Sequence, residues 1–497
     1  MWQKIESIIK SREALLSLLL ISLAILYIPF KVTSYGWTPG DDAKRHSAFA
    51  TVNKEWSDIV VIKPEYSSDH NPGWHSILRV LHKMGADKTN LLRFSFIGLF
   101  LFVNFAGIIV SPKPIAWFAS LFLLLITEPG ILGRLLLGRP YLFSFAITLL
   151  LFKLWSEQKL CIKSQIKLPI SVILITLSVW IHGSWYLFLL IPFSFFLAGK
   201  NKAALQLFAC IIAGTLLGAL LSGDFAGFLR FHTFATINIF SEKTFNWLLV
   251  TEFRAGNIPI IWLLVALPII FYLSNINKLN PRELLSDPVF MMVLLNWMLG
   301  IMTIRFWIDW GLPALMYWLS FRISDVLNSS DIFKEPRIKY GLTLFMIVST
   351  VFVATNDGGG RFSKAVFDQP IDFSEERLKG WAPEPGAIIY SNNMGVFYKH
   401  FHAYPEMPWK YILGFESALM PDEDRKILRN IGYNFGRTEE FLPWINKMRP
   451  GDRMILYGNL KDVPNTEWIQ GSRFCWIGRK TASATANITT PPTSDTP

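Results

Sequence analysis

The sequence predicts a mainly α-helical protein: a polytopic transmembrane helical bundle of about eleven spans, followed by a small extracytoplasmic α/β domain. Three observations predict this class. The 497 residues are 52% hydrophobic and only 17% charged, whereas soluble proteins carry about 25% charged residues. Apolar residues gather in runs that approach the roughly 20 residues of a membrane-spanning helix. Between these runs, basic residues gather on alternate loops, which is typical of multi-pass membrane proteins.

The composition also narrows the class of partner. The formal net charge of +11 does not indicate nucleic-acid binding, because an excess of Lys and Arg is typical of cytoplasmic loops in membrane proteins. The cysteines, Cys161, Cys210 and Cys475, match neither a zinc-site spacing nor a disulfide framework. We therefore expect membrane lipids, and no nucleic acid, among the partners.

Eleven apolar segments are the predicted spans, although several are shorter than a straight crossing requires. They are Ala14–Phe30, Phe94–Val110, Ile115–Thr127, Tyr141–Trp155, Leu168–Ile181, Trp185–Ala198, Ala203–Leu221, Ile258–Leu273, Val289–Ile304, Phe306–Phe321 and Tyr340–Ala354. With a cytoplasmic N-terminus, every cytoplasmic loop is basic. These loops carry Lys113, Lys159, Lys163, Lys167, Lys200, Lys202, Lys278, Arg282, Arg322, Lys334, Arg337 and Lys339. The odd number of spans then puts the first loop and everything after Ala354 outside the cytoplasm.

The first outside loop, residues 31–93, is too long for a simple connector. It begins with the stretch Tyr35-Gly-Trp-Thr-Pro-Gly-Asp-Asp-Ala-Lys-Arg-His46. Two amphipathic segments follow, His46–Trp56 and Trp74–Met84, and we expect interfacial helices there. The second has a predicted N-cap, a proline in its first turn and a terminating glycine: Asn71, Pro72 and Gly85.

Asp41 and Asp42 are adjacent carboxylates just outside the first span. One interpretation is a helix N-cap, because Pro-Gly-Asp-Asp is a common helix start. The other is that one of them is a catalytic base, and the local sequence does not separate the two. Successive residues on a helix point about 100° apart. One carboxylate would therefore face a reacting group, while the other binds a metal ion or a basic partner that relieves their repulsion.

The second outside loop carries Glu128, Arg134 and Arg139 among apolar residues near the membrane. Charges there are costly and usually have partners or ligands. The guanidinium offers a planar fork of donors suited to phosphate, so Arg134, Arg139 and, from a third outside turn, Arg305 are candidate phosphate-binding residues. The alternatives are lipid head-group contact, an ion pair of Glu128 with one Arg, and an i, i+4 pair of Arg305 with Asp309.

Further polar residues near this face are candidates for the substrate site: His46, His75, His182 and Glu128. His182 lies at an outside turn, where a lone His more often makes an interfacial hydrogen bond than binds a ligand. Charged and His residues recur at this face while the spans are nearly free of charge, which predicts a polar site there. The sequence leaves open whether a divalent metal takes part.

The composition changes after residue 355. Residues 356–480 mix polar and apolar positions with Pro and Gly punctuation, which predicts a small α/β domain. The predicted strands are Ala387–Tyr390, Met454–Tyr457 and Phe474–Ile477, and the predicted helices are Asp422–Asn430 and Glu439–Lys447. Residues 481–497 are rich in Ser, Thr, Pro and Ala, which predicts a disordered tail.

The order of these parts resembles the GT-C superfamily of polytopic glycosyltransferases, which includes protein O-mannosyltransferases, bacterial aminoarabinose transferases and oligosaccharyltransferases. Gly40-Asp-Asp-Ala43 stands where that superfamily carries its paired acids. The resemblance implies that residues 1–355 form the catalytic domain and that Asp41 or Asp42 activates the acceptor. It also implies a polyprenyl-phosphate-linked sugar as donor, and a site on the periplasmic face of a bacterial inner membrane.

Such a transferase needs a base for the incoming hydroxyl or amine and positive charge for the departing phosphate. An inverting displacement requires no covalent nucleophile. The sugar, a hexose or a pentose, and the acceptor, a lipid, a glycan or a protein, are left open. The competing class is a transporter or flippase of a lipid-linked envelope precursor, which should show repeats and mid-membrane charges. A third class, a non-catalytic envelope protein, leaves the Gly40-Asp-Asp loop without a role.

Overall fold

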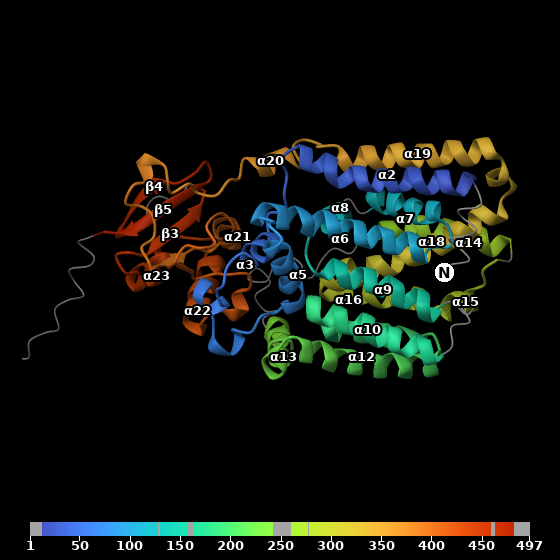
Figure 1. Cartoon of the computed structure of the whole chain (residues 1–497), viewed down its shortest axis with the longest axis horizontal. Helices are drawn as coiled ribbons and strands as arrows, with labels where there is room; N and C mark the ends of the chain where they lie inside the picture. Colours follow the sequence, from blue (N-terminus) through green and yellow to red (C-terminus); the bar gives the residue numbers. More distant parts are fainter. Residues whose placement is uncertain are drawn as a thin grey trace, which may run out of the picture.

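A bundle of long helices occupies one part of the molecule and a five-stranded sheet with its helices occupies the other (Figure 1). The computed structural model describes residues 12–127, 130–156, 164–241, 260–276, 278–458 and 463–481. The described chain is mainly α-helical, as predicted. Short helices from the first long loop lie between the bundle and the sheet. The predicted disordered tail lies outside the described residues, except for Thr481.

Five helices of the bundle are long and apolar enough to cross a membrane. They are α2 (Arg12–Ser34), α6 (Lys88–Val110), α10 (Ser164–His182), α12 (Asn201–Leu221) and α19 (Pro336–Thr355). Shorter helices complete the bundle: α7 (Pro114–Thr127), α9 (Tyr141–Ser156), α11 (Leu190–Leu197), α14 (Ile261–Asn275), α16 (Pro288–Met302) and α18 (Leu312–Ser329). Each predicted span overlaps a helix, but within the described ranges only these five are long enough by themselves, so eleven crossings stay a prediction.

The outer surface of the bundle is apolar. Leu205 is 71% exposed, Leu264 70% and Phe352 65%. Large apolar side chains exposed in this number are typical of a surface that contacts a membrane or a partner. Together with the five long apolar helices, they indicate an integral membrane protein.

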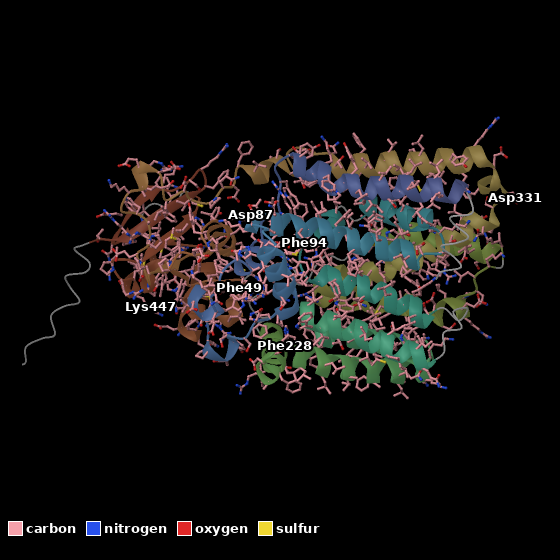
Figure 2. The ribbon with its side chains drawn as sticks, viewed as in Figure 1. Phe49, Asp87, Phe94, Phe228, Asp331 and Lys447 are labelled. Carbon is pink, nitrogen blue, oxygen red and sulfur yellow. The ribbon has the colours of Figure 1, made fainter. Side chains whose placement is uncertain are left out.

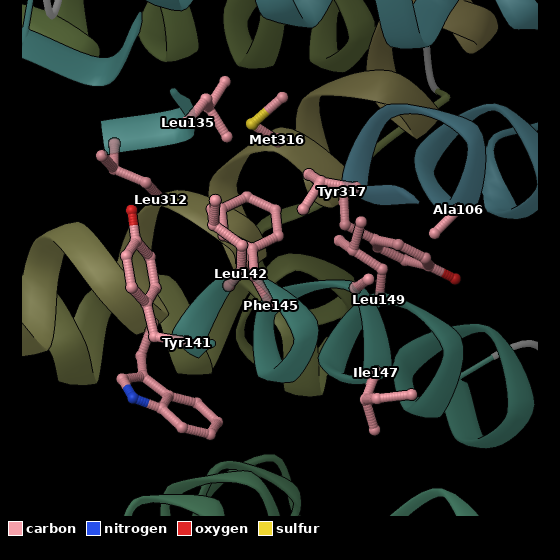
Figure 3. Close-up of a cluster of buried hydrophobic side chains, with 14 of the residues drawn as sticks. Ala106, Leu135, Tyr141, Leu142, Phe145, Ile147, Leu149, Leu312, Met316 and Tyr317 are labelled. Carbon is pink, nitrogen blue, oxygen red and sulfur yellow. The ribbon is translucent and has the colours of Figure 1, made fainter. Parts of the chain in front are cut away.

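Helix α9 lies at the centre of the bundle, where it packs against α6, α10 and α18. Figure 3 shows Leu142 and Phe145 of α9 among Leu312 and Met316 of α18. Neighbouring helices also approach closely: a Cβ at Gly107 on α6 would meet the Trp117 ring of α7 at 2.0 Å. These contacts form a dry core that holds the helix ends rigidly.

The first long loop contains three helices, α3 (Asp42–Phe49), α4 (Trp56–Ile59) and α5 (Pro72–Lys83). The helix predicted for the second amphipathic segment is present as α5, Gly85 follows it with a φ of +103°, and its place at a membrane interface stays a prediction. The prediction of one helix over His46–Trp56 is wrong. Helix α3 starts earlier and ends at Phe49, and a capping box formed by Glu55 and Asp58 starts α4 separately.

The sheet has the strand order β2-β1-β3-β5-β4. Its strands are β1 (Ile388–Tyr390), β2 (Lys410–Tyr411), β3 (Arg453–Tyr457), β4 (Thr466–Gln470) and β5 (Cys475–Lys480). Strand β1 runs parallel to β2 and β3, whereas β5 runs antiparallel to β3 and β4. The helices are α21 (Met394–Ala403), α22 (Asp422–Tyr433) and α23 (Leu442–Lys447). The three predicted strands lie on β1, β3 and β5, and the sequence patterns missed β2, β4 and α21.

The first long loop packs directly on the sheet part of the chain. The N–H of Val61 donates to the carbonyl of Tyr411 on β2 at 2.9 Å. Phe49 stacks on Trp56 with ring centroids 4.2 Å apart, and Trp56 contacts Phe415 edge-on at 5.0 Å. Figure 2 labels Phe49 at this junction between bundle and sheet. Residues far apart in the sequence therefore pack together at this end of the bundle.

Candidate active site

A cavity of about 160 Å³ lies where the first long loop, the end of the bundle and the sheet part of the chain meet. Charged and aromatic side chains line it together. The loop contributes Asp42, Arg45, His46, His70 and Asn71; the bundle side contributes Arg139, Tyr141, His182, Ser184, Tyr186, Phe231, His232 and Arg305; the sheet part contributes Tyr398, Phe415, Glu416 and Leu419. Such a concave site with convergent polar groups is the usual form of a ligand-binding pocket.

The paired acids stand at the start of α3. Asp41 occupies the N-cap position, but its side chain makes no capping hydrogen bond. Its Oδ2 instead accepts from Nη2 of Arg139 at 2.7 Å, and Nε of Arg139 lies 3.5 Å from Oδ2 of Asp42. One arginine thus offsets the repulsion between two adjacent carboxylates. Asp41 therefore stands at the helix start as predicted, but its side chain pairs with Arg139 and does not cap the helix, and the predicted basic partner is present.

Arg45 is the second cation beside the pair. Its Nε donates to Oδ1 of Asp42 at 2.7 Å, and its guanidinium lies over the Phe415 ring at 4.0 Å from the centroid. The residue is only 6% exposed. Among the described residues, Nη1 of Arg45 meets no hydrogen-bond acceptor. A buried guanidinium N–H of this kind is costly unless a ligand accepts from it, and Arg45 lines the cavity.

Arg305 and Arg134 share the buried carboxylate of Asp309. Nε of Arg305 donates to Oδ2 of Asp309 at 3.1 Å, and Nη2 of Arg134 donates to Oδ1 of the same residue. Asp309 lies in a π-helical turn, Trp307–Gly311, a feature that is frequent at functional sites. Arg305 also lines the cavity. Arg134 instead lies against the ring of Tyr141, so of this pair Arg305 is the better placed to meet a ligand.

Three residues of the loop form a hydrogen-bonded chain that ends at the cavity. Nδ1 of His75 lies 2.7 Å from Oδ2 of Asp69, and Nε2 of His75 lies 2.7 Å from Nδ1 of His46. Burial alone would raise the pKa of Asp69, but the attraction of His75 and the N–H of Asn71 hold it well below its usual range. Burial lowers the pKa of both His46 and His75. At neutral pH this hydrogen-bonded series therefore joins one carboxylate to two uncharged imidazoles.

Two further histidines stand on the wall formed by Phe231. His70 stacks on this ring with centroids 3.6 Å apart, and burial followed by the charge of Arg45 lowers the pKa of His70. His232 donates from Nε2 to the carbonyl of His70 at 3.2 Å, and burial lowers its pKa to about 4. His182 contacts the hydroxyl of Ser144 through Nδ1 at 2.9 Å. His182 therefore makes a hydrogen bond, as predicted, while it also lines the cavity.

The structure brings most of the predicted site residues together. Asp42, Arg139, Arg305, His46 and His182 line one cavity. Those that take part through a neighbour are Asp41, by way of Arg139, and His75, by way of His46. Glu128 lies outside the described residues. Within the described ranges, no three His, Cys, Asp or Glu side chains gather as a metal site would require, so no metal ligands can be named.

Sequence reasoning missed several residues of the site. Asp69 and His70 form a short polar run, Asp69-His-Asn71, before the proline that starts α5, and this run was a usable signal. No local pattern points to Tyr398 or to residues 415–416, because they enter the site only through the docking of the sheet part.

The comparisons with known proteins identify a fold. No family model matches the chain, and no curated protein sequence matches it. The structure is similar to the cryo-EM structure of the arabinofuranosyltransferase AftD from Mycobacteria, with a TM-score of 0.53 and 12% sequence identity. The similarity covers 92% of this chain but only 41% of that one. At this identity the likeness shows a shared fold.

Proposed function

We propose that this chain is a membrane glycosyltransferase that moves a sugar from a polyprenyl-phosphate donor to an acceptor hydroxyl or amine. One observation carries the proposal: Asp42 and three arginines, Arg45, Arg139 and Arg305, line a single cavity at the end of an apolar bundle, and Asp41 pairs with Arg139 beside it. The fold likeness to a membrane arabinofuranosyltransferase supports it. A pentose donor is the first to test, because that neighbour transfers arabinofuranose.

The proposed chemistry assigns a separate role to the acids and to the arginines of the cavity. Asp42 takes the proton of the acceptor, whose oxygen or nitrogen forms a bond to the anomeric carbon while the bond from that carbon to the phosphate oxygen breaks. The departing polyprenyl phosphate gains negative charge, which Arg139, Arg305 and Arg45 stabilise. The configuration inverts because a single displacement occurs. Asp41 acts as a positioning residue, since it anchors Arg139 beside Asp42.

The cavity is proposed to open on the extracytoplasmic face. The sheet lies at one end of the bundle, and the basic connection that contains α15 (Pro281–Leu285) lies at the other (Figure 1). Lys113 and Asn328, from two other predicted cytoplasmic loops, contact each other at 2.5 Å. Positive loops stay in the cytoplasm, so the opposite end, with the cavity, would face the periplasm of a bacterial inner membrane.

The purified full chain in liposomes should consume a polyprenyl-phosphate pentose, releasing polyprenyl phosphate when an envelope lipid or glycan acceptor is present. Vesicles whose protein exposes the sheet to added protease should use an impermeant acceptor from outside. Movement of the intact donor lipid between leaflets, without release of polyprenyl phosphate, would instead support the flippase alternative and contradict the transferase.

Arg305→Ala should raise the KM for the donor by about ten- to a hundredfold, because a charge-assisted contact to phosphate contributes about 1.5–3 kcal/mol. Asp309 keeps Arg134 as its partner in this variant, so the buried carboxylate is still compensated. Arg134→Ala is the matched comparison: it should lower thermal stability more than donor affinity. Equal changes of the donor KM in the two variants would contradict a phosphate contact that is specific to Arg305.

A further inference from the structure

The chain Asp69–His75–His46 leaves His46 with only one arrangement of its ring protons. An ionised carboxylate only accepts hydrogen bonds, so Nδ1 of His75 carries the proton that Asp69 accepts. Nε2 of the neutral His75 is then an acceptor, and Nδ1 of His46 must donate to it at 2.7 Å. The lone pair of His46 is therefore on Nε2, and His46 lines the cavity.

The ring of His70 also carries its proton on Nδ1, for a different reason. Its Nδ1 lies 2.7 Å from the carbonyl of Ser68, which can only accept, so the proton is on Nδ1. The lone pair is on Nε2, and among the described residues no donor reaches that atom. His70 is 6% exposed and is held between Phe231 and Phe415, with ring centroids 3.6 and 4.9 Å away. A buried acceptor left without a donor is costly.

The surroundings oppose protonation of both imidazoles. His46 faces burial first and then Arg45, His75, Arg139 and His70, and all of these lower its pKa. For His70, burial and then Arg45 lower the pKa, while Asp69 and the carbonyl of Ser68 partly oppose them. A general base works best when its pKa lies near the operating pH. These two rings are therefore poor bases and suitable neutral acceptors, which leaves proton removal to Asp42.

We propose that His46 and His70 accept hydrogen bonds from hydroxyl groups of a carbohydrate in the cavity, and thereby select a hydroxylated sugar. The unpartnered Nε2 of His70 requires a donor, Nε2 of His46 can accept from a second one, and sugar hydroxyls supply both. The unpartnered Nη1–H of Arg45 in the same cavity matches a sugar or phosphate oxygen. The inference rests on the proposed function. The hydroxyls belong either to the donor's sugar or to the acceptor.

Binding to the full chain in detergent tests this without turnover. The probes are a polyprenyl-phosphate pentose, its 2- and 3-deoxy analogues, and sugar-free polyprenyl phosphate. The wild type should bind the glycosylated lipid at least about tenfold more tightly than the sugar-free lipid, and removal of the recognised hydroxyl should abolish most of that difference. His70→Phe and His46→Phe, which keep an aromatic ring but remove the acceptor, should abolish it too.

Sugar-free lipid should bind the variants as it binds the wild type, which shows that they are folded. His70→Gln, whose amide oxygen can accept, should recover part of the preference. His82→Phe is the matched control, because it makes the same His-to-Phe change away from the cavity. His82 lies on α5, and its ring bonds the carbonyl of Ala86.

Two outcomes identify the source of the hydroxyls. A lost preference for glycosylated lipid assigns them to the donor, whereas unchanged donor binding with a tenfold higher acceptor KM assigns them to the acceptor. Variants that keep both the donor preference and the acceptor KM would overturn the inference. A wild type that binds glycosylated lipid selectively but transfers nothing would contradict the proposed function alone.

Discussion

Asp42→Asn is expected to reduce sugar transfer by about 10²–10⁴-fold, the usual contribution of general-base catalysis. In the wild type, Nε of Arg45 lies 2.7 Å from Oδ1 of Asp42. The amide oxygen of the variant can still accept this hydrogen bond, so the fold of α3 should survive. What the variant loses is the ability to take a proton. The measurement is release of polyprenyl phosphate per folded protein, with the donor Kd determined in parallel.

Two matched substitutions make this test specific. Asp41→Asn makes the same change one residue earlier and should cause a smaller loss, seen mainly as weaker donor binding, because it loosens Arg139. Asp87 is a capping residue in the ordinary sense, since its Oδ1 accepts from the N–H of Asn90 at 2.7 Å at the start of α6. Asp87→Asn should therefore leave transfer unchanged. Near-normal transfer by Asp42→Asn would show that Asp42 is not the general base.

The free energy of unfolding is expected to fall steeply as the pH drops below about 6.5, the ordinary pKa of histidine. Burial is the main cause that lowers the pKa of six histidines, His46, His70, His75, His232, His400 and His402, and for the last three it lowers the pKa to about 4. In the pH range between about 6.5 and these lowered pKa values, the unfolded chain binds protons that the folded chain excludes. Stability is then lost as the pH falls, at up to about 1.4 kcal/mol per histidine and pH unit.

The thermal midpoint of the detergent-solubilised chain, measured from pH 7.5 to pH 5, checks this. His400 is the matched site away from the cavity: its Nε2 accepts from the N–H of Ile371 at 3.1 Å, and its Nδ1 lies 2.8 Å from the carbonyl of Val396. His400→Gln should lower stability at pH 7.5 but make the acid loss shallower, by up to about 1.4 kcal/mol per pH unit if the histidines act independently. A thermal midpoint that is constant over this range would contradict neutral buried histidines.

The sequence by itself determined the features that depend on local pattern. The apolar runs predicted the helices of the bundle, because hydropathy and helical periodicity are read within one segment. The boundaries of α5 followed from its proline and from Gly85, since capping is a local property of the backbone. The place of Asp41 and Asp42, directly after the first apolar run, was also visible in the chain order.

Tertiary structure alone decided what those residues contact. Arg139 lies 98 positions from Asp41, and His75 lies 29 positions from His46, so no local pattern could choose between a capping carboxylate and a paired one. The same limit applies to the cavity wall at Tyr398 and Phe415, which comes from the sheet part of the chain. Side-chain partners of this kind depend on how separate elements pack, and packing is a property of the whole fold rather than of any segment.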